Sequence, residues 1–211
     1  MSERKVVIIM AVMTIMVILP SCAISPINLS FDSTILDSCG IITYGYGYGS
    51  CVAIEPNLIL TAGHCIDHAG AYIQIGGIQY DIIDQWKSDD HDVGFVRING
   101  NLPYIEFGKM PELLDEVYII GTPREPKFLN FITKGVICKL NLVESPPYID
   151  WENNFICDAM AWRGNSGGPV LNKYGYIIGI YVGLFPDVDN FSVCVPVRDI
   201  KAALEEYCNS I

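Results

Sequence analysis

The sequence contains little positive charge and few histidines. Of its 211 residues, 13 are Lys or Arg and 24 are Asp or Glu, so the formal net charge is −11 at pH 7. Nucleic-acid binding normally needs a basic patch, and this balance argues against nucleic acid as a partner. With three histidines in the chain, catalysis that needs a histidine base has few candidates.

The chain also lacks linkers, repeats and metal-binding spacings. From Ile24 onward we find no long Gly/Ser linker and no repeat of solenoid length. A length of 211 residues predicts one domain or two small ones. No cysteine pair has the spacing of a zinc site, so we expect neither a metal nor a cofactor. Twelve Tyr and nineteen Gly favour strands and turns, hence an all-β protein.

The N-terminus has the order of an export signal. Arg4 and Lys5 precede fourteen uncharged residues over 6–19, followed by a short segment that ends at Ala23. The apolar run is shorter than the roughly 20 residues that span a bilayer, so an uncleaved membrane anchor is the weaker alternative. We therefore assign residues 1–23 to an export signal.

Two processing routes fit this signal. Leu19-Pro20-Ser21-Cys22 resembles a bacterial lipobox, which would attach a membrane-bound lipoprotein through Cys22. Ordinary signal peptidase could instead cleave after Ala23 and release a periplasmic or extracellular protein that begins at Ile24. Either route removes Cys22 from disulfide pairing and leaves seven of the eight cysteines. An oxidising compartment favours disulfides among them.

Short β-type runs recur along the rest of the chain and are separated by turn signals. Their regular spacing predicts sandwiches or barrels, and a break near 103–111 divides the β-region in two. Within Tyr44–Gly49, the alternation of Tyr and Gly predicts three tyrosines on one face of a strand. Apolar residues at helical spacing predict a C-terminal helix over about 199–208, capped by Asp199: Ile200, Ala203, Leu204 and Tyr207.

The strongest chemical signal is Gly164-Asn165-Ser166-Gly167-Gly168-Pro169. A serine on a tight glycine-rich turn exposes its hydroxyl, and nearby backbone N–H groups can bind an oxyanion. Here those donors would be the N–H groups of Gly164 and Ser166. The alternative is an ordinary glycine-rich turn that contains a serine.

A serine nucleophile needs a base and a carboxylate that orients the base. His64 ends an apolar strand, whereas His68 and His91 have polar neighbours typical of solvated loops, so we take His64 as the base. Asp92 directly precedes the apolar run 93–96 and is our choice for the carboxylate, with Asp90 in reserve.

Three landmarks in this order resemble those of the chymotrypsin/trypsin-like serine protease superfamily: Thr61–Cys65, Asp92–Val96 and Gly164–Pro169. The resemblance covers about residues 40–205. It implies two six-stranded antiparallel β-barrels, over about 40–105 and 112–197, with a cleft between them. It also implies a serine endopeptidase that acts on protein or peptide substrates.

Within the superfamily, the chain is similar to HtrA-like and other bacterial proteases. The similarity lies in Gly49–Ile54, in Ile156 with Asp158, and in Val193–Pro196. Fifteen residues follow Pro196, so we expect no PDZ domain.

The resemblance also carries expectations about specificity and activation. Met160 stands six residues before Ser166, at the expected base of the specificity pocket, and its thioether favours small or medium apolar substrate side chains. The walls would come from Tyr181, Val182 and Gly183; the alternative is that Met160 belongs to the core. Asn165 replaces the acidic residue that pairs with a new N-terminus in trypsin-like zymogens, so we expect no such switch.

Two disulfides are expected as well. The resemblance implies a bond between Cys51 and Cys65 beside His64, and Cys138 and Cys157 fall on strands that would be adjacent. Two other functions stay open: a catalytically inactive homologue that serves as a surface binding module, and an esterase that uses the same triad.

Overall fold

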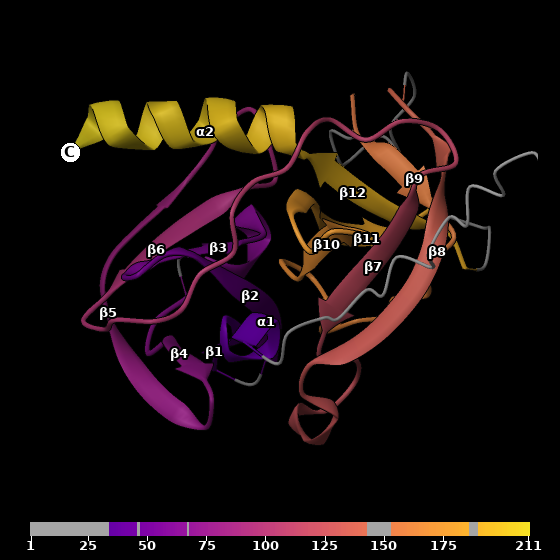
Figure 1. The fold of residues 1–211 in the computed structure, drawn as a ribbon. Helices are drawn as coiled ribbons and strands as arrows, with labels where there is room; N and C mark the ends of the chain where they lie inside the picture. The colour runs from indigo at the N-terminus through magenta and orange to yellow at the C-terminus, as the bar shows by residue number, and fades with distance from the viewer. Residues whose placement is uncertain (1–33, 46, 67, 143–152, 186–189) are drawn as a thin grey trace, which may run out of the picture.

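The computed structural model describes residues 34–45, 47–66, 68–142, 153–185 and 190–211. In it the chain folds into two closed six-stranded antiparallel β-barrels, side by side, with one long C-terminal helix (Figure 1). The predicted fold class is therefore confirmed. The expected export signal, with Cys22 and Ile24, lies outside the described residues.

The first barrel has the strand order β1-β2-β3-β6-β5-β4. Side chains alternate across the sheet in β4, where Ile73 and Ile75 are buried while Tyr72 and Gln74 are partly exposed. Its strands are β1 (Cys39–Tyr44), β2 (Gly47–Glu55), β3 (Leu58–Thr61), β4 (Tyr72–Ile75), β5 (Ile78–Lys87) and β6 (Gly94–Ile98).

The Tyr-Gly segment forms a hairpin, so the prediction of three tyrosines on one strand is wrong. Tyr44 ends β1 and pairs with Gly47 at the start of β2, which also contains Tyr48. Gly45 has a φ of 52° in the left-handed region and reverses the chain there.

The second barrel has the strand order β10-β11-β12-β9-β8-β7. Its strands β9, β10, β11 and β12 are buried along most of their length, and Val117, Ile119 and Phe155 are among its buried side chains. Its strands are β7 (Glu116–Gly121), β8 (Phe131–Lys139), β9 (Phe155–Cys157), β10 (Pro169–Asn172), β11 (Ile177–Leu184) and β12 (Ser192–Pro196). A short helix α1 (Thr34–Asp37), which the sequence did not indicate, precedes the first barrel.

The C-terminal helix α2 (Val197–Ser210) begins at the end of β12 and runs across to the first barrel (Figure 1). The predicted apolar face is confirmed, since Ile200, Ala203 and Tyr207 are buried and the partly buried Leu204 packs against the core. The cap is different: Pro196 is the N-cap residue, and Asp199 lies in the first turn, where it pairs with Arg198.

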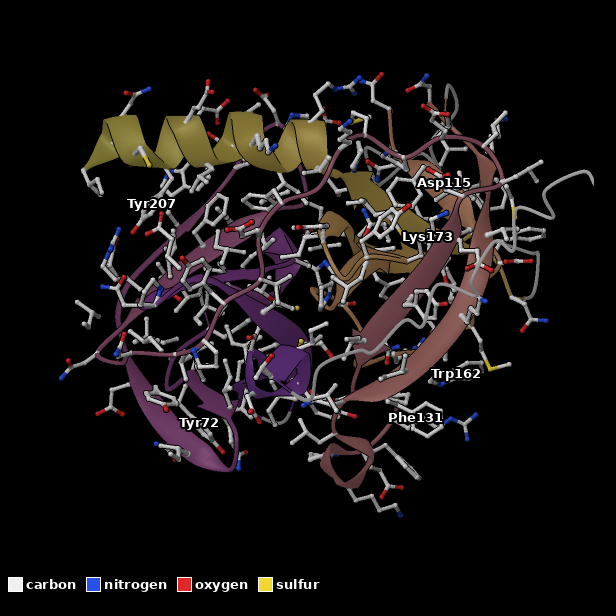
Figure 2. All side chains as sticks on the ribbon, in the orientation of Figure 1. Tyr72, Asp115, Phe131, Trp162, Lys173 and Tyr207 are labelled. Carbon is white, nitrogen blue, oxygen red and sulfur yellow. The ribbon has the colours of Figure 1, made fainter. Side chains whose placement is uncertain are left out.

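Tyr207 anchors the helix to the first barrel (Figure 2). Its ring stacks on Phe95 with centroids 5.6 Å apart and lies 5.9 Å from that of Trp86. Its hydroxyl accepts a hydrogen bond from Arg97 Nε and donates one to Asp84, each at 3.2 Å.

Across the described part of the chain, no helix is both long and apolar enough to cross a membrane.

Candidate active site

His64 lies where β3 ends. The buried strand continues into a short 3₁₀ helix, Gly63–Cys65, and the residues on both sides of His64 are buried. A Cβ atom on Gly63 would be 3.2 Å from an oxygen of Asp92, so glycine permits the close approach of these two segments. The His64 side chain is 46% exposed. A rigid backbone thus presents a solvent-facing imidazole.

Asp92 precedes β6 and binds His64 at two points. One carboxylate oxygen accepts the backbone N–H of His64 at 2.9 Å, and the other is 2.7 Å from Nδ1. With Nδ1 donating to the carboxylate, Nε2 of the neutral ring is free to accept a proton. Asp90, the reserve candidate, is exposed, and its backbone N–H donates to Ser88 Oγ. The structure therefore brings together His64 and Asp92.

The environment of His64 changes its proton affinity. Burial lowers the pKa of the imidazole, but the hydrogen bond and charge of Asp92, with a further contribution from Cys65, raise it more. The resulting pKa lies above the ordinary value of 6.5. The carboxylate thus stabilises the imidazolium that a general base forms on taking a proton.

The other two histidines lie outside this pair. His68 is exposed, stacks on Tyr44 with centroids 4.2 Å apart, and lies with Nε2 3.3 Å from the His64 carbonyl oxygen. His91 lines a cavity of about 260 Å³ together with His64, Asp92 and residues 87–90.

Ser166 lies on a tight turn between β9 and β10. The turn is held by hydrogen bonds from Asn165 N–H to the Trp162 carbonyl, at 3.0 Å, and from Gly168 N–H to the Asn165 carbonyl, at 2.8 Å. Gly164 and Gly167 have φ values of 98° and 86°, which side chains rarely tolerate. The glycines of this segment are therefore required by its backbone.

The turn packs directly against the segment that carries His64. A Cβ atom on Gly167 would collide with Thr61 Oγ1 and with the backbone N of Ala62. The Cys65 thiol lies 3.8 Å from the Ser166 carbonyl oxygen. Among the described residues, the Ser166 hydroxyl has no hydrogen-bond partner. The site thus places the Ser166 turn against the end of β3 and the short 3₁₀ helix that carries His64.

The backbone around Ser166 contains the two N–H groups that the sequence indicated as oxyanion donors, those of Gly164 and Ser166. In a trans peptide the N–H and C=O point in opposite directions, so fixing a carbonyl fixes the adjacent N–H. The Arg163 carbonyl accepts the N–H of Arg124 and the Asn165 carbonyl accepts that of Gly168, both at 2.8 Å. These bonds orient the N–H groups of Gly164 and Ser166, and neither donates to a backbone oxygen in the described part of the chain.

Asn165 is 2% exposed, and its side chain packs against Gly121. Its Oδ1 atom has no hydrogen-bond partner within the described ranges. Since an amide carries no charge, a salt bridge at this position would need a different residue. The expectation that no N-terminal ion pair switches this chain on stays a prediction.

The expected specificity residues differ in how they are placed. Met160 is 60% exposed, which excludes the alternative that it is core, and its carbonyl accepts a hydrogen bond from Thr133. Tyr181 is 2% exposed and packs in the second-barrel core, so its side chain cannot form a pocket wall. Its backbone pairs with the residues after Ser166, and Val182 is buried while Gly183 is partly exposed.

All seven described cysteines are free thiols, and neither expected disulfide is formed. Cys51 and Cys65 are both buried beside the site, where the Cys65 thiol interacts with the His64 ring. Cys138 is exposed, whereas Cys157 is buried in the core of the second barrel with Cys194. The contact of Cys65 with His64 was missed from the sequence, although the two are adjacent in the chain.

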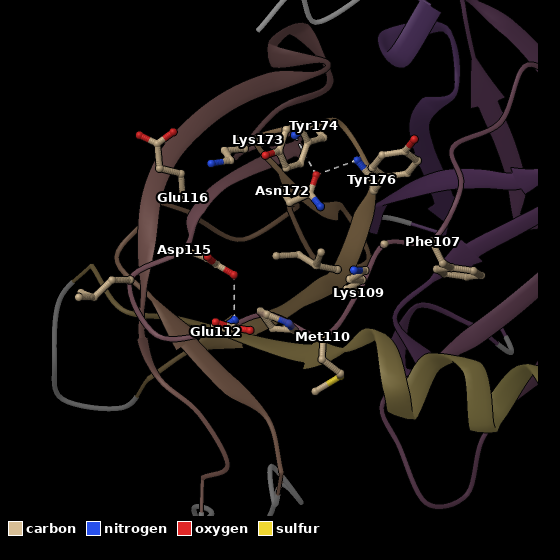
Figure 3. Close-up of a pocket in the computed structure, with 14 residues that line it drawn as sticks. Phe107, Lys109, Met110, Glu112, Asp115, Glu116, Asn172, Lys173, Tyr174 and Tyr176 are labelled. Atoms are coloured by element: carbon tan, nitrogen blue, oxygen red, sulfur yellow. Dashed lines mark hydrogen bonds between the residues drawn. The ribbon is translucent and has the colours of Figure 1, made fainter. Parts of the chain in front are cut away.

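A larger pocket of about 720 Å³ lies on the second barrel, between the segment 107–116 and the β10–β11 hairpin (Figure 3). Its polar groups hold turns: Asp115 accepts the Glu112 N–H at 2.9 Å, and Asn172 Oδ1 accepts the N–H groups of Tyr174 and Tyr176. Its lining contains none of the expected catalytic residues.

Two antiparallel barrels with a histidine–aspartate pair on one and a serine turn on the other define the class of chymotrypsin-like serine hydrolases. The profile of the trypsin-like peptidase domain family matches residues 49–180, and the chain belongs to that family.

Relatives and solved structures agree with this assignment. A serine protease HtrA-like protein of Staphylococcus haemolyticus is 30% identical over 119 residues, 51% of this chain and 18% of the relative. The putative mitochondrial protease Do-like 12 of Arabidopsis thaliana is 27% identical over 74% of this chain and 33% of its own length. The chain thus spans a third or less of these curated relatives.

Two solved structures show the same fold. The serine endoprotease from Yersinia pestis gives a TM-score of 0.71 at 22% identity, over 81% of this chain and 62% of that one. The active form of the Rv3671c protease from M. tuberculosis gives a TM-score of 0.73 at 18% identity, over 82% of each chain.

Proposed function

We propose that this protein is a serine endopeptidase in which Ser166, His64 and Asp92 form the catalytic triad. The observation that carries the proposal is the two-point attachment of His64 to Asp92, at 2.9 and 2.7 Å, next to the turn of Ser166, whose hydroxyl has no hydrogen-bond partner among the described residues. Membership of the trypsin-like peptidase domain family supports the reaction class.

In the proposed mechanism, Ser166 Oγ attacks the carbonyl carbon of the scissile peptide bond while His64 Nε2 takes the hydroxyl proton. The N–H groups of Gly164 and Ser166 stabilise the oxyanion. His64 then gives the proton to the leaving amine, and an acyl-enzyme remains. A water molecule activated by His64 hydrolyses the ester and restores the serine hydroxyl.

We further propose that small or medium apolar substrate side chains are preferred before the scissile bond. Met160 offers an exposed thioether without charge, which suits an apolar side chain better than a basic or acidic one. The backbone of Tyr181, Val182 and Gly183 would line the substrate strand. A peptide library identifies the cleaved bonds, and cleavage after Lys or Arg would contradict this assignment.

Export belongs to the same proposal and rests on the sequence of residues 1–23. Either lipid attachment at Cys22 or release at Ile24 would deliver the protein outside the cytoplasm. Mass spectrometry of the intact mature protein distinguishes the two, because an acylated Cys22 and an unmodified Ile24 give different masses. A mature chain that retains Met1 would contradict both routes.

The triad is tested with a fluorophosphonate probe and a peptide library on the wild type and on Ser166→Ala, His64→Ala and the control His68→Ala. We expect labelling and cleavage by the wild type and by His68→Ala, and a loss of at least about 10³-fold in the two triad variants. A folded wild type that does not react would favour the binding module. Labelling with hydrolysis of esters alone would favour the esterase.

A further inference from the structure

Ser50 connects the first barrel to the turn that carries Ser166. It lies in β2 and is 1% exposed. Its backbone N–H donates to the Ser166 carbonyl at 2.7 Å, and its hydroxyl donates to the Gly164 carbonyl at 2.7 Å. One residue of the first barrel therefore binds this turn at two points, on either side of Asn165.

The direction of the hydroxyl bond is fixed by its second partner. Thr122, directly after β7, donates its backbone N–H to Ser50 Oγ at 2.9 Å. Because an N–H can only donate and a carbonyl can only accept, the hydroxyl proton must point to Gly164. The Ser50 carbonyl is held as well, since it accepts the Thr61 hydroxyl at 2.8 Å. The side chain is thus locked in one orientation.

The peptide that Ser50 holds lies between the two proposed oxyanion donors. Its oxygen is the Gly164 carbonyl bound by Ser50, and its N–H is that of Asn165, which donates to the Trp162 carbonyl at 3.0 Å. The N–H of Gly164 comes just before this peptide and the N–H of Ser166 just after it. A rotation of this peptide would change the direction of both donors.

We infer that Ser50 is a positioning residue that keeps the oxyanion-binding N–H groups of Gly164 and Ser166 aligned for catalysis. The inference rests on the proposed endopeptidase function. Loss of the hydroxyl would leave the Gly164 carbonyl and the Thr122 N–H without this partner in a buried place. Without this bond the turn would hold the two N–H groups in several directions. The transition state would then lose more stabilisation than the bound substrate loses.

The test compares Ser50→Ala with Ser38→Ala in the mature protein. Ser38 is also 1% exposed, and its hydroxyl donates to one carbonyl, that of Thr34, at 3.2 Å. Ser38→Ala is therefore a matched control that removes a buried hydroxyl outside the site. We expect kcat on a cleaved peptide to fall about 10- to 100-fold in Ser50→Ala with little change in KM. A peptide aldehyde, which mimics the tetrahedral intermediate, should bind more weakly by a similar factor. Ser38→Ala should keep the wild-type kcat.

Active-site titration normalises each rate to folded enzyme. If Ser50→Ala does not fold, Ser50→Cys assayed under reducing conditions replaces it, because a thiol is a weaker donor at the same position and should lower kcat in the same direction. Wild-type kcat in the folded Ser50 variant, or an equal loss in Ser38→Ala, would overturn the inference. A wild type that neither labels nor cleaves would instead overturn the proposed function.

Discussion

Asp92 accepts two hydrogen bonds from His64, one from the backbone N–H and one from Nδ1 of the ring. The first bond fixes the backbone of the 3₁₀ helix, and the second selects the tautomer in which Nε2 carries no proton. The orientation and the protonation state of His64 therefore depend on the same carboxylate.

Asp92→Asn tests this dependence. An amide keeps the size of the side chain but can donate to Nδ1, which favours the wrong tautomer. We expect kcat to fall by about 10³- to 10⁴-fold while the fold is retained. The matched control is Asp90→Asn, whose side chain is exposed. Activity is measured on a peptide substrate and folding by circular dichroism. Equal losses in both variants would show that the charge of the loop, not Asp92 itself, supports catalysis.

The pH dependence follows from the pKa of His64. The general base must be neutral, so kcat/KM should rise as pH passes through this pKa. Because Asp92 raises the pKa of His64 above its ordinary 6.5, the rise should be centred above that value. In Asp92→Asn the carboxylate is absent, and the pKa should fall.

NMR titration measures these pKa values directly. The three histidine signals can be assigned with His68→Ala and His91→Ala. A His64 signal that titrates at the same pH in the wild type and in Asp92→Asn would contradict the electrostatic role of the carboxylate.

Gly167→Ala should destabilise the protein much more than a comparable change elsewhere. Gly167 has a φ of 86°, and an added Cβ would collide with Thr61 Oγ1 and the Ser50 carbonyl oxygen. Gly70 has a similar φ of 73° but open space around the added atom. We expect Gly70→Ala to cost about 1–2 kcal/mol from backbone strain and Gly167→Ala more than about 3 kcal/mol. Urea unfolding measures the free energy of unfolding of both variants. Similar losses would mean that the Ser166 turn does not pack against the end of β3 as described.

Much of the fold and the site could be predicted from local sequence patterns. Short β-type runs separated by turn signals indicated most strands, and the helical spacing of Ile200, Ala203, Leu204 and Tyr207 indicated the face of α2 that packs on the core. His64 and Asp92 each adjoin an apolar strand, which is why the sequence indicated them before any distance was known.

The other features of the fold and the site depend on contacts between segments that are far apart in the sequence. The sequence does not show that Ser50 meets Gly164, because their bond joins residues 114 positions apart. Nor does it show that Tyr181 faces the core, since its segment reads as a continuous apolar run. The expected bond between Cys138 and Cys157 failed in the structure for a related reason: strand adjacency does not say which face a thiol occupies, and Cys138 is exposed where Cys157 is buried. Nothing in the structure explains why Cys51 and Cys65, both buried, are unbonded.

Tyr207 should make a large contribution to stability because it docks α2 on the first barrel. It is 1% exposed, and its ring stacks on Phe95. We expect Tyr207→Ala to lower the free energy of unfolding by about 3–5 kcal/mol, as for other large buried aromatic residues. Tyr207→Phe should cost about 1 kcal/mol, because it removes only the hydrogen bonds of the hydroxyl.

The control for the Tyr207 variants is Tyr174→Ala on the second barrel, where the side chain is 61% exposed and the expected change is within about 0.5 kcal/mol. Urea unfolding followed by circular dichroism gives the free energies. If Tyr207→Ala were no more destabilising than Tyr174→Ala, α2 would not be packed on the first barrel in solution. A large cost for alanine with a small one for phenylalanine would assign the stabilisation to burial of the ring.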